Sequence, residues 1–208
     1  ALDDAVGRIV GALERNGLID KTLVVFLDDN GGPMYTKVQN NGPLRMGKLF
    51  LFEGGVRVPM ILSWPGVLET DKVFRGTTSS LDVFPTVCAA AGIVLPDTLK
   101  LDGVDLAPYL KGEREGAPHR SLAWSNGPNK AFLQGKWKII KSGDHTWLFD
   151  LSEDIGETTN LAARNPEIVQ RLENALDKWL GQMPPPAWPS KPTRKIVNID
   201  GIPYEQNI

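Results

Sequence analysis

The sequence is poor in the residues that most thiol and histidine sites require. Its 208 residues include one cysteine, Cys88, and two histidines, His119 and His145. A single cysteine excludes an internal disulfide and a cysteine-ligated zinc site, and two histidines exclude a multi-histidine metal centre. The same scarcity disfavours papain-type and serine-protease chemistry. We expect both histidines to lie at the surface, in loops.

The chain also lacks an excess of charge and any long apolar run. It carries 23 Lys and Arg against 25 Asp and Glu, for a net charge of −2. This balance disfavours a nucleic-acid partner, which would require a basic surface. No run approaches the roughly 20 apolar residues that span a bilayer. We therefore expect an ordinary globular protein with no nucleic-acid partner and no membrane span.

The first residues predict an amphipathic helix that ends near Asn16 and Gly17. Leu2, Val6, Ile9, Val10 and Leu13 follow one another at helical spacing. The pattern begins at once after Ala1, without a capping residue or a recognisable signal peptide. We therefore expect the chain to be a piece of a longer protein.

Residues 22–92 predict part of an α/β sheet. The continuous apolar run 22–27 is typical of a strand buried on both faces of a parallel sheet. A long loop over 34–52 and a second short strand within 56–64 follow. A helix is predicted over 79–92, with Asp82 as its N-cap and Pro85 in its first turn. Its expected packed face is formed by Val83, Phe84, Val87, Cys88 and Ala91.

The pattern changes after residue 120. Four short runs, 121–124, 131–134, 137–141 and 146–151, predict an antiparallel meander. A helix is expected over about 165–181, because Asn165 and Pro166 form a strong helix start and an apolar stripe follows. The proline-rich tail 184–192 is expected to be extended. The predicted fold class is thus α/β, with the α/β core in residues 1–120 and a small antiparallel sheet plus helix in 121–208.

Asp29 and Asn30 are candidate metal ligands. They follow the buried strand 22–27, and the carboxyl ends of strands in open α/β sheets are where ligands bind. Carboxylate and amide oxygens are hard donors that suit Ca²⁺ or Mg²⁺. The alternative is that Asp-Asn-Gly-Gly forms only a turn. An EF-hand loop fits poorly, since its twelfth position is Gln39.

Lys48 is a candidate anion contact, because a lysine in a glycine-flanked loop donates to anions as a mobile charge. A solvated surface lysine is the alternative. Glu53 and Arg57 follow, and we expect them to pair and to fix the loop that carries Lys48. For these two, the alternative is an exposed hairpin ion pair worth about 0–1 kcal/mol.

Several segments in the same order resemble the C-terminal half of the type I sulfatases, which belong to the alkaline phosphatase superfamily. The resemblance covers residues 1 to about 180 and implies part of an alkaline-phosphatase-like α/β sandwich. The matching segments are LVVFLDDNGG (23–32), NGPLRMGK (41–48), FEGGVRVP (52–59), WPG (64–66), LDVFPTVCAAAG (81–92), LDGVDL (101–106), KWKII (136–140) and LFDLSEDIGETTNL (148–161).

The resemblance implies roles for three residues. Asp29 and Asn30 correspond to two ligands of a bound Ca²⁺ (or Mg²⁺), and Lys48 corresponds to the lysine that contacts the sulfate group. A divalent cation and a lysine on opposite sides of a sulfate ester would lower the barrier to its hydrolysis.

Three positions depart from the family pattern. Asp28 stands where the family has Ser or Thr, and Met46 and Leu49 stand where it tends to have Gly. The two missing glycines bear on the backbone path of the loop around Lys48, and Asp28 bears on the charge near the metal.

The resemblance also implies parts that this sequence does not contain. The family's nucleophile is a formylglycine made from a C/S-x-P-x-R block, which nothing here matches. Cys88 precedes three alanines and is expected to be a small core residue. We therefore expect the chain to serve a sulfatase acting on aryl or carbohydrate sulfates, to need the N-terminal half of the same protein as its partner, and to be inactive alone. Family habit implies a periplasmic, secreted or lysosomal location.

Two other functions are considered. The first is a phosphate or phosphonate ester hydrolase of the same superfamily. The second is a non-catalytic carbohydrate-binding remnant, in which Trp124, Trp137, Trp147 and Trp188 would form a platform.

Overall fold

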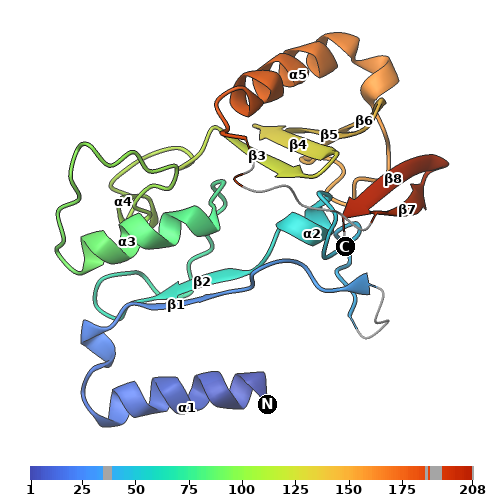
Figure 1. Ribbon diagram of the computed structural model, residues 1–208. Helices are drawn as coiled ribbons and strands as arrows, with labels where there is room; N and C mark the ends of the chain where they lie inside the picture. The colour runs from blue at the N-terminus through green and yellow to red at the C-terminus, as the bar shows by residue number, and fades with distance from the viewer. Residues whose placement is uncertain (35–38, 186, 188–193, 208) are drawn as a thin grey trace. The chain divides into compact units, whose positions relative to one another are not determined.

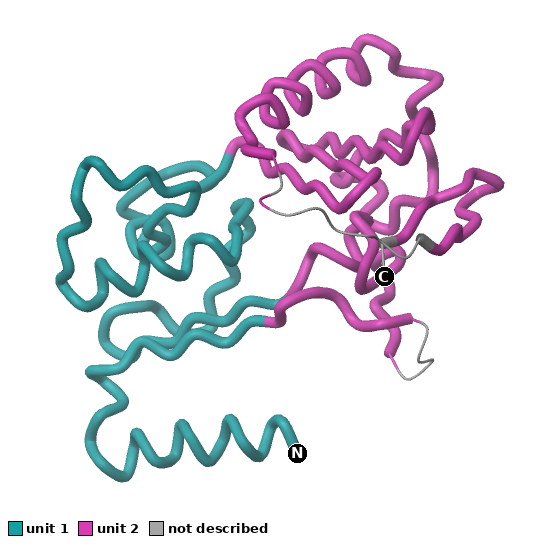
Figure 2. Tube along the Cα trace, in the orientation of Figure 1, with its two compact units in different colours: residues 1–27, 59–119 teal, residues 28–58, 120–208 magenta. Residues whose placement is uncertain are grey.

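The computed structural model describes residues 1–34, 39–185, 187 and 194–207, and it divides into two compact units (Figure 1, Figure 2). Unit 1 contains residues 1–27 and 59–119, and unit 2 contains residues 28–58 and 120–208. Residues 28–58, which carry the three candidate site residues, therefore belong to the same unit as the C-terminal part of the chain.

Unit 1 contains three α-helices, two short 3-10 turns and a two-stranded sheet. Its elements are α1 (Leu2–Arg15), η1 (Ile19–Lys21), β1 (Val24–Leu27), β2 (Met60–Ser63), η3 (Ser80–Asp82), α3 (Val83–Ala90) and α4 (Ala107–Leu110), together with connecting loops. The helix α1 ends at the predicted place, but none of its residues is buried. β1 pairs with β2 in antiparallel register, with Val24 opposite Ser63. The expectation of a parallel sheet is wrong for this pair, and all four residues of β1 are half-buried instead of fully enclosed.

Asp82 organises the start of α3 from a buried position. Its Oδ2 accepts a hydrogen bond from the Ser79 backbone N at 2.8 Å, and its Oδ1 accepts one from Val104 N at 2.9 Å. His119 Nε2 lies 2.7 Å from the same Oδ1. Asp82 is the N-cap residue of α3, as predicted, although its side chain makes no capping hydrogen bond to that helix. Ser79 caps the preceding 3-10 turn η3, with Asp82 as its partner in a capping box. The expectation that His119 is a surface residue is wrong, since its side chain is only 12% exposed.

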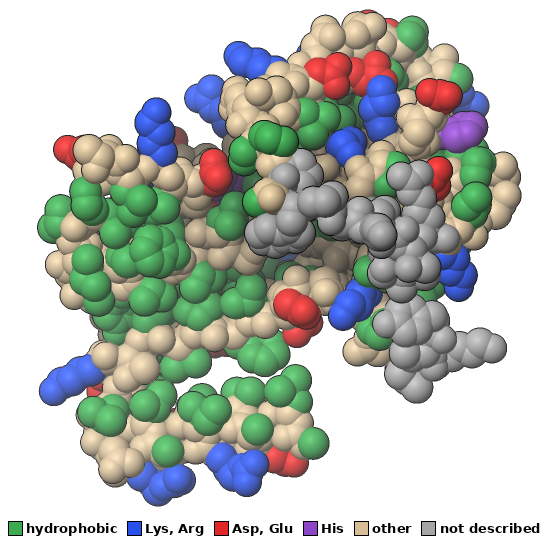
Figure 3. All heavy atoms as spheres, in the orientation of Figure 1, with side chains coloured by type: hydrophobic (Ala, Val, Ile, Leu, Met, Phe, Trp, Pro, Cys, Tyr) green, Lys and Arg blue, Asp and Glu red, His purple; other side chains and the backbone are tan. Residues whose placement is uncertain are grey.

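The packed face of α3 differs from the predicted one. Thr86 and Cys88 are buried, whereas Phe84 and Val87 are 53% and 45% exposed. The Thr86 hydroxyl donates to Asp82 O at 2.6 Å and accepts from Leu106 N at 2.9 Å. These hydrogen bonds hold the Thr86 side of α3 against the rest of unit 1. The more apolar side of the helix, with Phe84 and Val87, therefore faces the solvent. Hydrophobic side chains accordingly gather at the surface over α3 (Figure 3).

Unit 2 is built on a four-stranded meander. Its elements are α2 (Glu53–Val56), β3 (Ser121–Asn126), β4 (Asn129–Gln134), β5 (Trp137–Ser142), β6 (His145–Asp150), η4 (Ala162–Arg164), α5 (Pro166–Leu180), β7 (Arg194–Ile199) and β8 (Ile202–Asn207). Strands β3 to β6 pair in sequence order, all antiparallel, which confirms the predicted sheet. His145 is exposed as expected, but it begins β6 and does not lie in a loop.

The meander buries both of its faces. On one face it packs against α5, whose Leu172 and Leu176 are fully buried, as the predicted apolar stripe requires. On the other face, the strand residues that point away from α5 pack against residues 51–52 and against the β7–β8 hairpin. The buried residues of this second core are Leu51, Phe52, Ala131, Ile140, Trp147, Phe149, Ile199 and Tyr204.

Sequence patterns did not predict the β7–β8 hairpin. It is a two-stranded antiparallel sheet in which Ile199 pairs with Ile202. The prediction of an extended tail over 184–192 falls mostly on residues 186 and 188–192, which lie outside the described residues. Within the described part of the chain, no helix is long and apolar enough to cross a membrane.

Candidate active-site loops

Asp29 and Asn30 lie directly after β1, at the start of unit 2. Asp29 is exposed, and its Oδ1 accepts a hydrogen bond from the Asn30 backbone N at 2.9 Å. The side-chain nitrogen of Asn30 donates to Gly31 O at 3.1 Å. No hydrogen bond within the described residues uses the side-chain oxygen of Asn30. The pair therefore presents adjacent hard oxygen donors, of the kind that Ca²⁺ and Mg²⁺ prefer.

Lys48 lies half-buried in the middle of residues 45–52, here called the Lys48 loop. Two residues beside it have left-handed backbone conformations, Met46 with φ of 60° and Leu49 with φ of 79°. These are the two positions at which the resemblance to the sulfatases led us to expect glycine. Such a conformation costs a non-glycine residue roughly 1–2 kcal/mol. It persists only where the surroundings determine the path of the chain.

Backbone hydrogen bonds join the Lys48 loop to the segment that follows Asn30. Lys48 N donates to Gly32 O at 3.2 Å, and Gly31 N donates to Gly55 O at 3.0 Å. The side chain of Asn41 completes the junction, because its Oδ1 accepts from Gly32 N at 3.0 Å and its Nδ2 donates to Gly32 O at 2.9 Å. The two segments that carry the candidate residues are thus held side by side.

Glycines make this close approach possible. A Cβ atom at Gly31 would collide with the carbonyl oxygen of Gly54, and one at Gly47 would collide with that of Gly32. The backbone at these crossings leaves no room for any side chain.

The structure therefore brings together the segments of Asp29, Asn30 and Lys48. Within the described residues, no hydrogen bond or ion pair joins the Lys48 side chain to either of the other two, and no group of three or more His, Cys, Asp and Glu side chains is placed to hold a metal ion. Their roles as metal ligands and as a sulfate contact remain predictions from the sequence.

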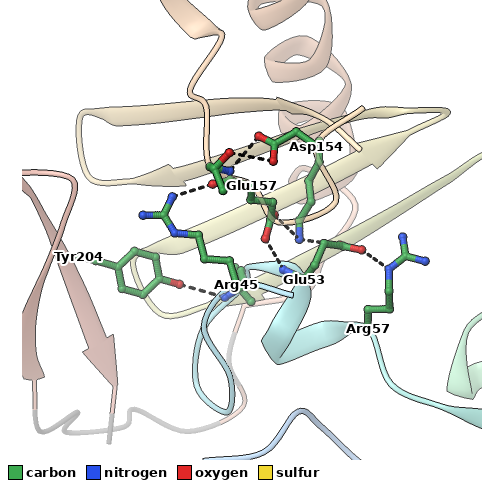
Figure 4. A network of polar contacts seen from close by, with 9 residues as sticks. Arg45, Glu53, Arg57, Asp154, Glu157 and Tyr204 are labelled. Atoms are coloured by element: carbon green, nitrogen blue, oxygen red, sulfur yellow. Dashed lines mark hydrogen bonds and ion pairs between the residues drawn. The ribbon is translucent and has the colours of Figure 1, made fainter. Parts of the chain in front are cut away.

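A buried ionic network lies directly after the Lys48 loop (Figure 4). Glu53, the first residue of α2, places its Oε1 2.8 Å from Lys138 Nζ and pairs through its Oε2 with Arg57. Lys138 Nζ also lies 3.0 Å from Glu157 Oε1. The other carboxylate oxygen of Glu157 accepts a hydrogen bond from Glu53 N at 2.6 Å. The predicted pairing of Glu53 with Arg57 is confirmed, although it belongs to a buried network and not to an exposed hairpin.

The two carboxylates of this network are affected in opposite directions. Burial acts to raise the pKa of Glu53, but the charges of Lys138 and Arg57 outweigh burial and hold that pKa below its ordinary value. Burial also raises the pKa of Glu157, and the charge of Lys138 offsets this effect only in part. Glu53 is therefore the carboxylate that the two cations stabilise in its charged form.

Sequence reasoning missed Lys138 and Glu157. Lys138 has no exposed side-chain surface, although a lysine in a short strand is ordinarily read as solvated. One signal was available, because strand alternation places Lys138 on the same face as Ile140, which is a core residue. A lysine on a core face requires a buried acidic partner.

The tryptophans do not form a shared platform in the described structure. Trp147 is fully buried in the core of unit 2, while Trp124 and Trp137 are half-buried. Trp188 lies outside the described residues. The burial of Trp147 removes one of the four tryptophans that a carbohydrate-binding remnant would need.

Comparisons with known proteins support the resemblance to sulfatases that the sequence segments indicated. The sulfatase family profile matches residues 1–93. A sulfatase from Formosa agariphila is 30% identical over 239 residues, covering 98% of this chain and 41% of that protein. Human arylsulfatase A is 36% identical over 207 residues, covering 83% of this chain and 40% of that protein.

A solved structure extends the similarity to the fold. The crystal structure of Ps i-CgsB in complex with k-i-k-neocarrahexaose superposes with a TM-score of 0.80 at 32% identity, covering 89% of this chain and 42% of that one. The chain belongs to the type I sulfatase family. It spans about two fifths of the length of the sulfatases that it matches. The α/β fold predicted from the sequence is confirmed by these sulfatase neighbours.

Proposed function

We propose that this chain forms part of a sulfate-ester hydrolase, to which it contributes Asp29 and Asn30 as metal ligands and Lys48 as the cation that contacts the sulfate group. The observation that carries the proposal is the hydrogen bond from Lys48 N to Gly32 O, at 3.2 Å, which fixes the Lys48 loop beside the segment of Asp29 and Asn30. A cationic donor and two oxygen ligands on adjacent backbone segments suit an anionic ester bound to a divalent cation.

The donors on these two residues fit part of a calcium or magnesium site. The Asp29 carboxylate is exposed, and the side-chain nitrogen of Asn30 is held by Gly31 O, which leaves the side-chain oxygen to face a ligand. Ca²⁺ takes about 6–8 oxygen ligands, so two residues supply only a minority of the set. When bound, the cation would polarise the sulfate oxygens.

The nucleophile of this hydrolase would come from the rest of the protein. Cys88, the only cysteine, is buried within α3 and followed by three alanines, and no described feature activates it. We infer that the remaining part of the polypeptide would supply a formylglycine hydrate as the nucleophile, and that the isolated chain does not turn over sulfate esters. Unit 1 offers that part an apolar surface, with Leu81, Phe84 and Ile61 each more than half exposed.

A sulfated glycan is the substrate class that we favour. Ps i-CgsB, at 32% identity, is solved in complex with the saccharide k-i-k-neocarrahexaose. Aryl sulfates form the second class, since human arylsulfatase A is 36% identical to this chain.

Two substitutions in the complete gene product test the proposal. We expect Lys48→Ala and Asp29→Asn each to lower the kcat/KM for an aryl sulfate by about 10²–10³-fold, as removing one charge-stabilising group does in other enzymes. Lys178→Ala, which removes an exposed lysine from α5, is the matched control and should leave kcat/KM unchanged. An effect below threefold for Lys48→Ala would refute the role of Lys48. Preferential turnover of a phosphate ester would favour the phosphatase alternative.

A further inference from the structure

The β7–β8 hairpin contacts the Lys48 loop with one of its faces. Tyr204 and Ile199 are fully buried on this face, whereas Ile196 on the opposite face is 68% exposed. The hairpin turns at Asp200 and Gly201, whose φ values of 54° and 81° are both positive, as in a two-residue turn of type I′. Strand alternation thus presents one set of side chains to the rest of unit 2.

Tyr204 of the hairpin contacts the C-terminal end of the Lys48 loop. The hydroxyl of Tyr204 accepts a hydrogen bond from the backbone N of Leu51 at 3.2 Å (Figure 4). Its ring packs beside those of Phe50 and Phe52, with centroid distances of 5.3 and 6.1 Å. Leu51 is buried, so the hydroxyl satisfies a backbone donor that would otherwise lack a partner in an apolar setting.

Asp200 of the same hairpin contacts the N-terminal end of the loop. Its Oδ1 lies 2.6 Å from Arg45 Nη2, and Arg45 Nη1 donates to Glu157 O at 2.7 Å. The Arg45 side chain is 19% exposed and that of Asp200 is 46% exposed, so this charge-assisted contact is partly open to solvent, while the bond to Glu157 O holds the guanidinium group on its other side.

Lys48 lies between these two anchors, together with both strained residues. Met46 follows the Arg45 anchor and Leu49 precedes the Leu51 anchor, and each has a left-handed backbone. The loop sequence itself does not favour this path, so contacts outside the loop must impose it. The hairpin supplies side-chain contacts at both ends.

We propose that the β7–β8 hairpin is a positioning element of the active site, in which Tyr204 and Asp200 hold the Lys48 loop in the conformation that directs Lys48. The inference rests on the proposed function for the role of Lys48, but the hold on the loop is a separate property and can be measured without any substrate. Tyr204 and Asp200 touch the loop and act through it, so they are positioning residues.

The first experiment measures hydrogen exchange in the complete gene product. Tyr204→Phe removes one hydroxyl and keeps the ring, and Asp200→Asn removes the charge while retaining a residue that suits a type I′ turn. We expect amide exchange in a peptide covering residues 45–52 to accelerate about tenfold in Tyr204→Phe and several-fold in Asp200→Asn, with exchange in β4 and β5 unchanged. The matched control is Tyr109→Phe, which removes the same atom from α4 in unit 1 and should change nothing in this peptide. Unchanged exchange over 45–52 in both variants, or an equal acceleration throughout unit 2, would overturn the proposal.

The second experiment links the hold on the loop to Lys48. We expect Tyr204→Phe to lower kcat/KM for an aryl sulfate about tenfold, and to have no further effect when Lys48 is already Ala, because the two changes would remove one interaction. A tenfold loss that persists in the Lys48→Ala background would overturn the positioning role. If Lys48→Ala alone leaves activity intact, the proposed function fails, while the exchange experiment still decides whether the hairpin holds the loop.

Discussion

The ammonium group of Lys138 lies 2.8 Å from the Glu53 carboxylate, and both side chains are almost completely withdrawn from solvent. This pair joins strand β5 to the first residue of α2, immediately after the Lys48 loop. Breaking a buried ion pair leaves an uncompensated charge, and this cost is usually larger than the net stabilisation that the intact pair provides.

We predict a large loss of stability for Lys138→Met. The substitution keeps the volume of the side chain but leaves Glu53 and Glu157 buried without their shared cation. The expected decrease in the free energy of unfolding is about 3–5 kcal/mol. Urea unfolding measures it, with Lys141→Met as the control on the same strand. Lys141 pairs with Glu173 near the surface, so its loss should cost about 0–1 kcal/mol. Equal effects of the two substitutions would contradict the assigned role of Lys138.

The raised pKa of Glu157 predicts a pH-dependent effect of Glu157→Gln. In the folded protein this carboxyl holds its proton to a higher pH than the value of 4.5 expected when it is exposed, so folding binds a proton in that window. The stabilisation from this group is therefore complete below pH 4.5 and is lost as the pH rises towards the folded pKa. Glu53, Lys138 and Arg57 surround the same site, and the depressed pKa of Glu53 acts in the opposite direction at lower pH.

We expect the wild-type protein to lose stability relative to Glu157→Gln as the pH is raised from about 4.5. Gln keeps an oxygen that can accept the hydrogen bond from Glu53 N. Unfolding free energies measured at several pH values for both proteins give the difference directly. Glu153→Gln, at an exposed position nearby, shows whether the loss of any carboxylate in this segment gives the same trend. A difference that stays constant with pH would show that Glu157 does not have the assigned environment.

The left-handed backbone at Leu49 predicts a reversal of the ordinary order of glycine and alanine. At most positions in a helix or strand, a protein with glycine is less stable than one with alanine, by roughly 0.5–1 kcal/mol. At a φ of 79° the alanine side chain is strained and glycine is not. We therefore expect Leu49→Gly to be more stable than Leu49→Ala by about 1 kcal/mol, since both remove the same leucine side chain. Thermal unfolding of the two variants makes the comparison, and a more stable Ala variant would argue against this backbone conformation.

The proposed metal ligands predict a dependence of activity on divalent cations. We expect chelation by EDTA to abolish aryl sulfate turnover by the complete gene product, and added Ca²⁺ to restore it. In Asp29→Asn, half-maximal activity should need at least tenfold more Ca²⁺, because one charged oxygen ligand has become neutral. The isolated chain, with two of the ligands, should bind Ca²⁺ weakly or not at all in calorimetry. Micromolar binding by the isolated chain would contradict a ligand set divided between two parts of the protein.

Regular periodicity made some elements predictable from the sequence. The helix α5 carries an apolar stripe at helical spacing, and the four strands β3 to β6 are short runs separated by turn residues. In both cases local preference and burial favour the same structure, so the pattern was sufficient. The candidate residues Asp29, Asn30 and Lys48 were identified in a different way, from the order of the sulfatase-like segments. Periodicity alone could not have singled them out.

The missed features depend on contacts between residues far apart in the chain. Lys138 is buried because Glu53, 85 positions away, lies opposite it. The outward turn of Phe84 follows from the anchoring of Thr86 by Leu106 N. Tyr204 meets Leu51 across 153 positions. Local patterns contain no information about such partners, so none of these contacts could be predicted from the sequence.

The conformations of Met46 and Leu49 have a consequence for protein engineering. Because these two residues adopt a backbone that their own side chains disfavour, the shape around Lys48 is a property of the scaffold and is not encoded in the eight residues themselves. Grafting residues 45–52 alone onto another protein should therefore fail to reproduce that shape. A graft that also carries the β7–β8 hairpin and the glycine segments 31–32 and 54–55, which contact the loop, would have the contacts needed to do so.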